Sequence, residues 1–263
     1  MPRVSIYPFS VILLQLLLLA GCASSAGGSG DTTAVTKPEG LNPGGLYLGT
    51  ISNGYIHNTL VLENGQYYVF YGISTTPALK VAGFVQGSGT LNNGSFSSTD
   101  LKDFVWDGSI SSGTLGASYS GSNFNGTLTK IASTVSLAGA PPAVAYYDFN
   151  EAPNILDIAG GWTLTSMAGA ATTMSIDSNG TFAGKNGRCA YTGTLTPRAS
   201  GKNVFDVVLT FGGSPCPMPD QTVSGAAISY LLADGVTRQF ILAGVNAARS
   251  KGTAVFGTRS PLK

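Results

Sequence analysis

The amino-acid sequence predicts an all-β protein that contains two tandem antiparallel β-barrels, each a meander of about eight strands. The first observation is composition, because only 10% of the 263 residues are charged and 36 are glycine. Such a chain suits short strands joined by many tight turns. The second observation is a regular series of short alternating segments separated by turn residues, and the third is an internal repeat. No segment keeps apolar residues at the 3.6-residue period over the length of a helix.

The chain divides into five expected segments. They are a signal peptide over residues 1–21, a lipidated cysteine with a flexible tether over 22–40, a first β-barrel over 41–131, a linker over 132–153 and a second β-barrel over 154–263. The tether is rich in small residues without apolar periodicity, and the linker contains two consecutive prolines and an acidic stretch. Each barrel has about 100 residues, which is enough to bury a core of its own.

The first 22 residues carry an export signal. Arg3 provides a positive charge, and the apolar run over 11–19 is too short to span a bilayer, which takes about 20 apolar residues. The run leads into Leu19-Ala20-Gly21-Cys22, which resembles the lipobox of bacterial lipoproteins. The resemblance implies cleavage before Cys22, lipidation of its sulfur and acylation of the new N-terminus, which together anchor a protein firmly. By resemblance to enteric sorting, Ala23 implies the outer membrane, with either the periplasmic or the surface face left open.

Two further cysteines, Cys189 and Cys216, remain after cleavage. An even pair in an oxidising compartment predicts a disulfide, which would stabilise the fold by about 3 kcal/mol. A zinc site needs three or four ligands, and the chain has a single histidine, His57. We therefore expect a disulfide, no metal and no cofactor.

An internal repeat relates the two halves of the body. Residues 59–67 and residues 173–182 both run as an alternating strand, an acidic residue, an Asn-Gly turn and an aromatic strand. An Asn-Gly pair between alternating segments is a strong hairpin signal. Tyr47 and Trp162 each stand 17 residues before the asparagine of that turn. The equal spacing favours duplication, with about eight strands in each half, one of them expected to begin near Trp106.

The second half also resembles the lipocalin and calycin group. Gly160-Gly161-Trp162 matches the G-x-W motif of that group at the first strand, and Arg259 stands near the end of the last strand. The resemblance implies a barrel-end plug, in which Arg259 lies on the face of Trp162 and binds nearby carbonyl groups. In the first half, Tyr47 and Lys130 would be weaker equivalents. The alternative is an ordinary core tryptophan and an unrelated surface arginine.

The search for catalytic patterns finds no nucleophile elbow and no phosphate-binding loop. A Ser-His-Asp triad could use only His57, which we expect in an exposed turn. Paired carboxylates support glycoside hydrolysis. The candidates are Asp100, Asp103 and Asp107, and Asp148, Glu151 and Asp157. We expect the first group to lie in a solvated loop and the second in the linker, and therefore no enzymatic activity.

Two features favour binding instead. Tyr67, Tyr68, Phe70 and Tyr71 place aromatic rings on both faces of one strand, so that one face could form an exposed recognition surface. The alternative is that both faces are buried. All five arginines of the mature chain lie in the second half, and arginine is favoured at interfaces and for anionic ligands. They are Arg188, Arg198, Arg238, Arg249 and Arg259.

Charge narrows the class of partner. Loss of Arg3 with the signal leaves one fewer than the 14 basic residues of the full sequence, against 13 acidic ones. A balanced chain lacks the basic face that nucleic acid or an anionic membrane surface requires. The sequence thus predicts a non-enzymatic envelope lipoprotein, held to the membrane by its lipid, which binds a small ligand or an envelope protein at the outer membrane. The alternatives are a structural accessory of an envelope complex and an inhibitor of a hydrolase.

Overall fold

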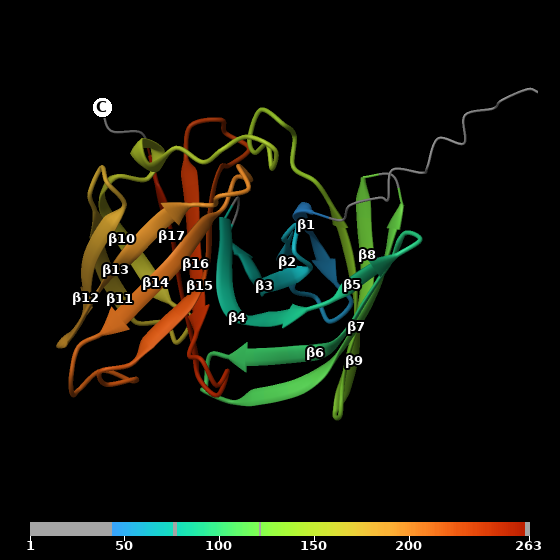
Figure 1. Ribbon diagram of the computed structural model, residues 1–263, viewed down its shortest axis with the longest axis horizontal. Helices are drawn as coiled ribbons and strands as arrows, with labels where there is room; N and C mark the ends of the chain where they lie inside the picture. The colour runs from blue at the N-terminus through green and yellow to red at the C-terminus, as the bar shows by residue number, and fades with distance from the viewer. Residues whose placement is uncertain (1–43, 76–77, 121, 261–263) are drawn as a thin grey trace, which may run out of the picture. The chain divides into compact units, whose positions relative to one another are not determined.

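A computed structural model describes residues 44–75, 78–120 and 122–260 (Figure 1). Cys22 and the signal peptide lie outside these residues, so the lipobox and the anchor stay predictions. Among the described residues, no helical segment has the length and apolar character needed to cross a bilayer. The described part is all-β, with two closed antiparallel barrels in tandem, which confirms the predicted fold class.

The first barrel is built from nine strands, eight of which close the ring. The strand order is β4-β3-β2-β1-β9-β8-β7-β6-β5, and pairing of β4 with β6 closes the barrel, while the short β5 only extends the hairpin with β6. The strands are β1 (Gly45–Ile51), β2 (Ile56–Val61), β3 (Gln66–Thr75), β4 (Ala78–Ser88), β5 (Thr90–Asn92), β6 (Ser95–Val105), β7 (Ile110–Ser120), β8 (Asn123–Lys130) and β9 (Ser133–Ala140).

The second barrel is a simple meander in which each strand pairs with the next, and β17 returns to β10. A single turn of 3₁₀-helix, η1 (Ile155–Asp157), precedes it, and the Asn154 side chain caps this turn. The strands are β10 (Gly160–Ser166), β11 (Ala171–Ile176), β12 (Thr181–Asn186), β13 (Cys189–Pro197), β14 (Phe205–Phe211), β15 (Thr222–Leu231), β16 (Arg238–Val245) and β17 (Gly252–Arg259).

The first barrel extends further along the chain than we expected. β9 lies inside residues 132–153, which we had assigned to the linker, and it pairs with both β8 and β1. Its sequence is Ser-Thr-Val-Ser-Leu-Ala-Gly-Ala, with small side chains that give only a weak apolar alternation. The expected strand at Trp106 is also absent, because Trp106 and Gly108 form the turn between β6 and β7.

The buried core has three parts, because the strands of both barrels alternate between two apolar faces. Tyr67, Val69 and Phe96 belong to the cluster inside the first barrel, and Trp162 and Phe240 belong to the cluster inside the second. A third cluster lies between the barrels, where β4 runs beside β17. Its buried members include Tyr68, Phe70, Phe84, Phe104, Ile228 and Ile241.

The two halves repeat the same hairpin. Gly65 and Gly180 each donate the backbone N–H to the carbonyl three residues earlier, at 3.0 and 2.9 Å, and both have a positive φ, of 81° and 85°. Each also accepts a hydrogen bond from the strand beyond the hairpin, from Gly89 at 2.9 Å and from Leu195 at 2.8 Å. A Cβ atom at either glycine would collide with that same neighbouring backbone. The matching geometry supports the predicted duplication.

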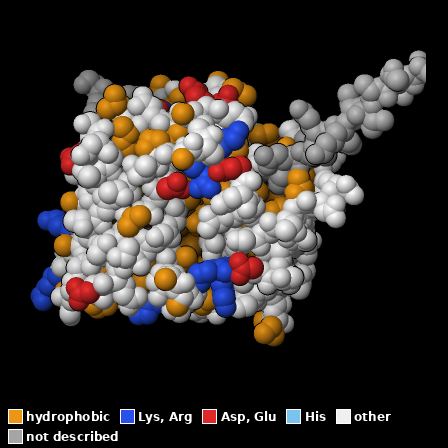
Figure 2. All heavy atoms as spheres, viewed as in Figure 1, with side chains coloured by type: hydrophobic (Ala, Val, Ile, Leu, Met, Phe, Trp, Pro, Cys, Tyr) orange, Lys and Arg blue, Asp and Glu red, His pale blue; other side chains and the backbone are white. Residues whose placement is uncertain are grey.

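Ion pairs join the barrels. Arg198 donates to Glu63 of the first barrel at 2.7 Å and to Asp206 of the second at 2.5 Å. Arg249 donates to the carboxylate of Asp100 at 2.5 Å and to its backbone carbonyl at 2.7 Å. Figure 2 shows acidic and basic side chains beside one another in the middle of the viewed face. Two of the five arginines thus serve an internal interface.

Candidate functional site

A cavity of about 390 Å³ opens at one end of the second barrel. Its lining is mostly apolar and comes from both barrels, with the turn between β6 and β7 of the first barrel at its edge. Lining side chains include Met167, Leu209, Phe211, Met218, Val255 and Trp106. A cavity of this size and character is typical of sites that bind small molecules.

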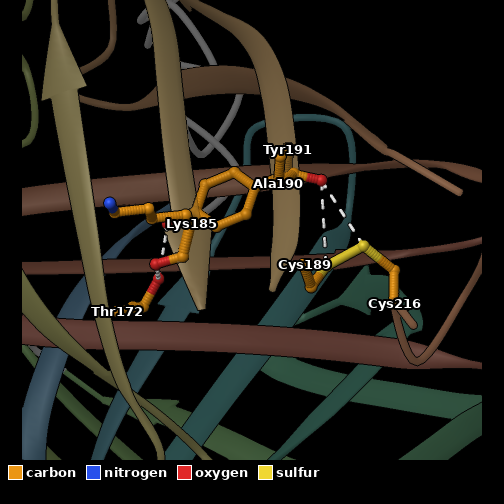
Figure 3. Close-up of a disulfide and its surroundings, with 6 residues drawn as sticks. All are labelled: Thr172, Lys185, Cys189, Ala190, Tyr191 and Cys216. Atoms are coloured by element: carbon orange, nitrogen blue, oxygen red, sulfur yellow. Dashed lines mark hydrogen bonds between the residues drawn. A yellow bond between two sulfur atoms is a disulfide. The ribbon is translucent and has the colours of Figure 1, made fainter. Parts of the chain in front are cut away.

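Two hydroxyl groups on the cavity wall, those of Thr172 and Tyr191, are hydrogen-bonded within the protein. The Thr172 hydroxyl donates to the carbonyl oxygen of Lys185 at 2.9 Å and lies 2.8 Å from the Tyr191 hydroxyl (Figure 3). Burial raises the pKa of Tyr191 above its usual value of 10.0. A molecule in this cavity would therefore meet mainly apolar surface.

The predicted disulfide between Cys189 and Cys216 is present at the edge of this cavity, with the two Cα atoms 4.6 Å apart. Cys189 begins β13, whereas Cys216 lies in the loop between β14 and β15, next to the cavity residue Pro217. Both sulfur atoms face the carbonyl oxygen of Ala190 (Figure 3). The bond thus ties the loop to the barrel wall at the cavity.

The predicted contact between Trp162 and Arg259 closes the opposite end of the same barrel. The guanidinium carbon of Arg259 lies 4.2 Å from the centre of the indole ring. The guanidinium donates to the carbonyl oxygens of Ala159 at 2.8 Å and Asp157 at 3.0 Å, and the indole N–H donates to Ile158 at 2.7 Å. Trp162 stands near the start of β10, whose other end reaches the cavity, so the plug and the opening lie at opposite ends.

A second cavity, of about 340 Å³, lies in the first barrel. One wall carries Asp103, which accepts a hydrogen bond from the Tyr71 hydroxyl at 2.7 Å and pairs with Lys130 at 2.5 Å. The rings of Tyr55 and Tyr71 stack at 5.9 Å beside this pair. Trp106, which is 57% exposed, lines both cavities.

Contrary to the prediction from the sequence, Asp100, Asp103 and Asp107 do not all lie in a solvated loop. Asp100 and Asp107 are exposed, but Asp103 is only 1% exposed and points into the barrel from β6. Lys130 neutralises it and does not act as the weaker plug that we expected. In the second group, Asp157 pairs with Arg238 at 3.1 Å. Within the described residues, no three His, Cys, Asp or Glu side chains gather as a metal site would require.

The predicted aromatic binding surface on β3 is wrong. Tyr67 is buried inside the first barrel, and Tyr68 and Phe70 are buried in the cluster between the barrels. The second barrel covers the face of β3 that carries Tyr68 and Phe70, for which the sequence allows either exposure or burial. Tyr71 is half-buried and lines the cavity of the first barrel.

His57 is not in an exposed turn, as we expected, but fully buried on β2. Its Nε2 atom lies 3.2 Å from the carbonyl oxygen of Ala138, which can only accept, so Nε2 carries the proton. Nδ1 then accepts from the Thr59 hydroxyl at 2.8 Å. Burial lowers the pKa of His57 and keeps the ring neutral.

Sequence reasoning missed Trp106 as a cavity residue. The dipeptide Asp107-Gly108 directly after it is a turn signal, and Gly108 has a positive φ of 85°. That signal could have placed Trp106 at a strand end near the barrel opening.

No protein-family model matches the chain, and no curated protein matches its sequence. Solved structures that match include a protein of unknown function from the DUF3598 family of Nostoc punctiforme, with 14% identity, coverage of 85% of this chain and 97% of that chain, and a TM-score of 0.28. Another is described as a "putative outer membrane protein" from Bacteroides fragilis, with 8% identity, coverage of 82% and 95%, and a TM-score of 0.23. Similarity at this level assigns no function.

Proposed function

We propose that this protein is a non-enzymatic lipoprotein of the outer membrane that binds a small apolar molecule in its second barrel. The observation that carries the proposal is the cavity of about 390 Å³, open at one end and closed at the other by Trp162 and Arg259. In this proposal the second barrel works as a small lipocalin-like container.

The wall chemistry supports an apolar ligand. Leu209, Phe211 and Val255 supply aliphatic and aromatic surface, and burying such surface contributes about 25 cal/mol per Å² of apolar area. The hydroxyl groups of Thr172 and Tyr191 are already paired. A strongly polar ligand would lose hydration against a wall that is mostly apolar, so neutral apolar molecules should bind best.

The His57–Thr59 pair lies away from the proposed site. The Thr59 hydroxyl is 2.8 Å from His57 Nδ1, and both side chains are fully buried in the first barrel.

The anchor rests on the lipobox at Cys22.

The experiment has two parts. The first is native mass spectrometry of the protein extracted gently from its own membrane, in which we expect an extra mass of a few hundred daltons. The second is titration of the delipidated mature chain, carrying Cys22→Ser, with the fluorescent apolar probe 1-aminoanthracene. Leu209→Trp fills the cavity and should reduce the number of probe molecules bound per chain by one. Val208→Trp is the matched control, because Val208 faces outward on the same strand and is 45% exposed.

Absence of saturable probe binding by the unmodified chain would refute the proposal. A bare protein in the mass spectrum, or one bound to a single polypeptide, would instead favour a docking role in an envelope complex. Inhibition of one enzyme in a panel of lysozymes and proteases would favour the inhibitor role.

A further inference from the structure

We infer that the cavity of the first barrel is a separate ligand site, which takes a neutral ring compound that carries a hydroxyl group, with phenols as the simplest class. This inference concerns a different cavity from the proposed function and stands independently of it. It starts from the Asp103–Lys130 ion pair, which is held inside the barrel beside two stacked tyrosine rings.

The ion pair has unused hydrogen-bonding capacity. Asp103 accepts one bond from Tyr71 and one from Lys130, whereas a carboxylate offers about four lone-pair sites. The Lys130 ammonium carries about three N–H donors, but among the described residues it donates to Asp103 alone. Its side chain is 25% exposed and lines the cavity. The cavity wall therefore presents a hydrogen-bond acceptor and a donor side by side.

A hydroxyl group complements this arrangement, because its single oxygen can donate to Asp103 and accept from Lys130. Tyr71 shows half of the geometry, since its own hydroxyl donates to Asp103 at 2.7 Å. A ligand carboxylate cannot donate and would be repelled by Asp103, and a ligand ammonium cannot accept and would be repelled by Lys130. The pair has no net charge, so it attracts neither kind of ion.

The remaining walls favour a flat ring. The rings of Tyr55 and Tyr71 are nearly parallel, with an interplanar angle of 21°, and Trp106 adds a third aromatic side chain. Aliphatic side chains, including Leu101 and Leu128, line the interior. Aromatic side chains pack on planar rings with a gain beyond the area that they bury. The volume of about 340 Å³ is sufficient for a small ring compound.

The test compares three probes of one shape by isothermal titration calorimetry at pH 7. 2-Naphthol can donate and accept, 2-methoxynaphthalene can only accept, and 2-naphthoate is an anion. The delipidated mature chain with Leu209→Trp is used, so that the cavity of the second barrel is filled. We expect 2-naphthol to bind one to one and about tenfold or more tighter than either analogue, because the hydroxyl bonds to charged partners.

Variants locate the binding. Asp103→Asn together with Lys130→Met removes both charges without leaving either one unpaired, and should reduce 2-naphthol affinity to that of 2-methoxynaphthalene. Lys102→Met is the matched control, because Lys102 neighbours Asp103 on β6 but bonds outside the cavity to Ser112. Equal affinity for the three probes, or unchanged 2-naphthol binding by the double variant, would overturn the inference. Loss of 2-naphthol binding on filling the second-barrel cavity would also overturn it.

Discussion

Replacement of Gln239 by leucine should be among the most damaging changes at the junction of the barrels. Gln239 is 1% exposed, and its amide oxygen accepts from the Leu79 N–H at 3.0 Å and from the Tyr230 hydroxyl at 2.8 Å. Its amide nitrogen donates to the Leu79 carbonyl at 2.7 Å. Leucine would leave three buried polar groups on Leu79 and Tyr230 without these partners.

The magnitude follows from those three groups. A buried group that loses its hydrogen-bond partner costs about 1–3 kcal/mol, so the lower half of that range gives a total of about 3–6 kcal/mol for three groups. Tyr230 retains its contact with Asn58, at 2.6 Å, which keeps the loss below the upper limit. The apolar gain from leucine is small, because the glutamine already buries its own methylene groups. The free energy of unfolding should therefore fall by about 3–5 kcal/mol.

The assay is urea unfolding of the delipidated chain, followed by circular dichroism. Gln86→Leu is the matched control, because Gln86 is equally buried, at 3%, but its amide oxygen has no hydrogen-bond partner among the described residues. That change should alter the free energy of unfolding by less than about 1 kcal/mol. A loss of under 1 kcal/mol for Gln239→Leu, or equal losses for both variants, would refute the reasoning about paired and unpaired buried amides.

Three further predictions concern stability. Arg259→Met should lower the free energy of unfolding by about 2–3 kcal/mol in the same urea assay, because the hydrogen bonds to backbone carbonyl groups and the cation–π contact with Trp162 are lost. Arg188→Met is the control at an exposed site and should change that free energy by under about 0.5 kcal/mol. Reduction of Cys189–Cys216 should cost about 3 kcal/mol, and identical melting curves with and without reductant would contradict this. His57 has a lowered pKa through burial, so below its usual value of 6.5 the unfolded chain binds a proton that the folded chain does not. Stability is therefore full above pH 6.5 and should fall between pH 6.5 and 5, by at most about 1.4 kcal/mol per pH unit, and His57→Gln should remove this slope.

Most of the fold could be predicted from local sequence patterns. The hairpins at Gly65 and Gly180 depend on neighbouring residues, and both agree with the structure. β9 was missed because its small side chains give only a weak apolar alternation, although it forms a local hairpin with β8 before it pairs with β1.

The site was less predictable, because it depends on how the barrels pack. The alternation of aromatic side chains along β3 indicated two aromatic faces. No local sequence pattern indicated that the second barrel covers Tyr68 and Phe70. The burial of Asp103 was hidden for a similar reason, since its partner Lys130 lies two strands away on β8. By contrast, the contact of Arg259 with Trp162 joins the first and last strands of one barrel, which a closed meander always brings together.

The placement of the two tryptophans gives the protein its own optical readout. Trp162 is 3% exposed beneath a guanidinium group, so its emission should be blue-shifted and shielded from acrylamide. Trp106 is 57% exposed at the wall that both cavities share, so its emission should be red-shifted and accessible to the quencher. Occupation of either cavity should change the second signal alone, and opening of the barrel end should change the first. Ligand uptake and loosening of the barrel could thus be followed separately in one unlabelled sample.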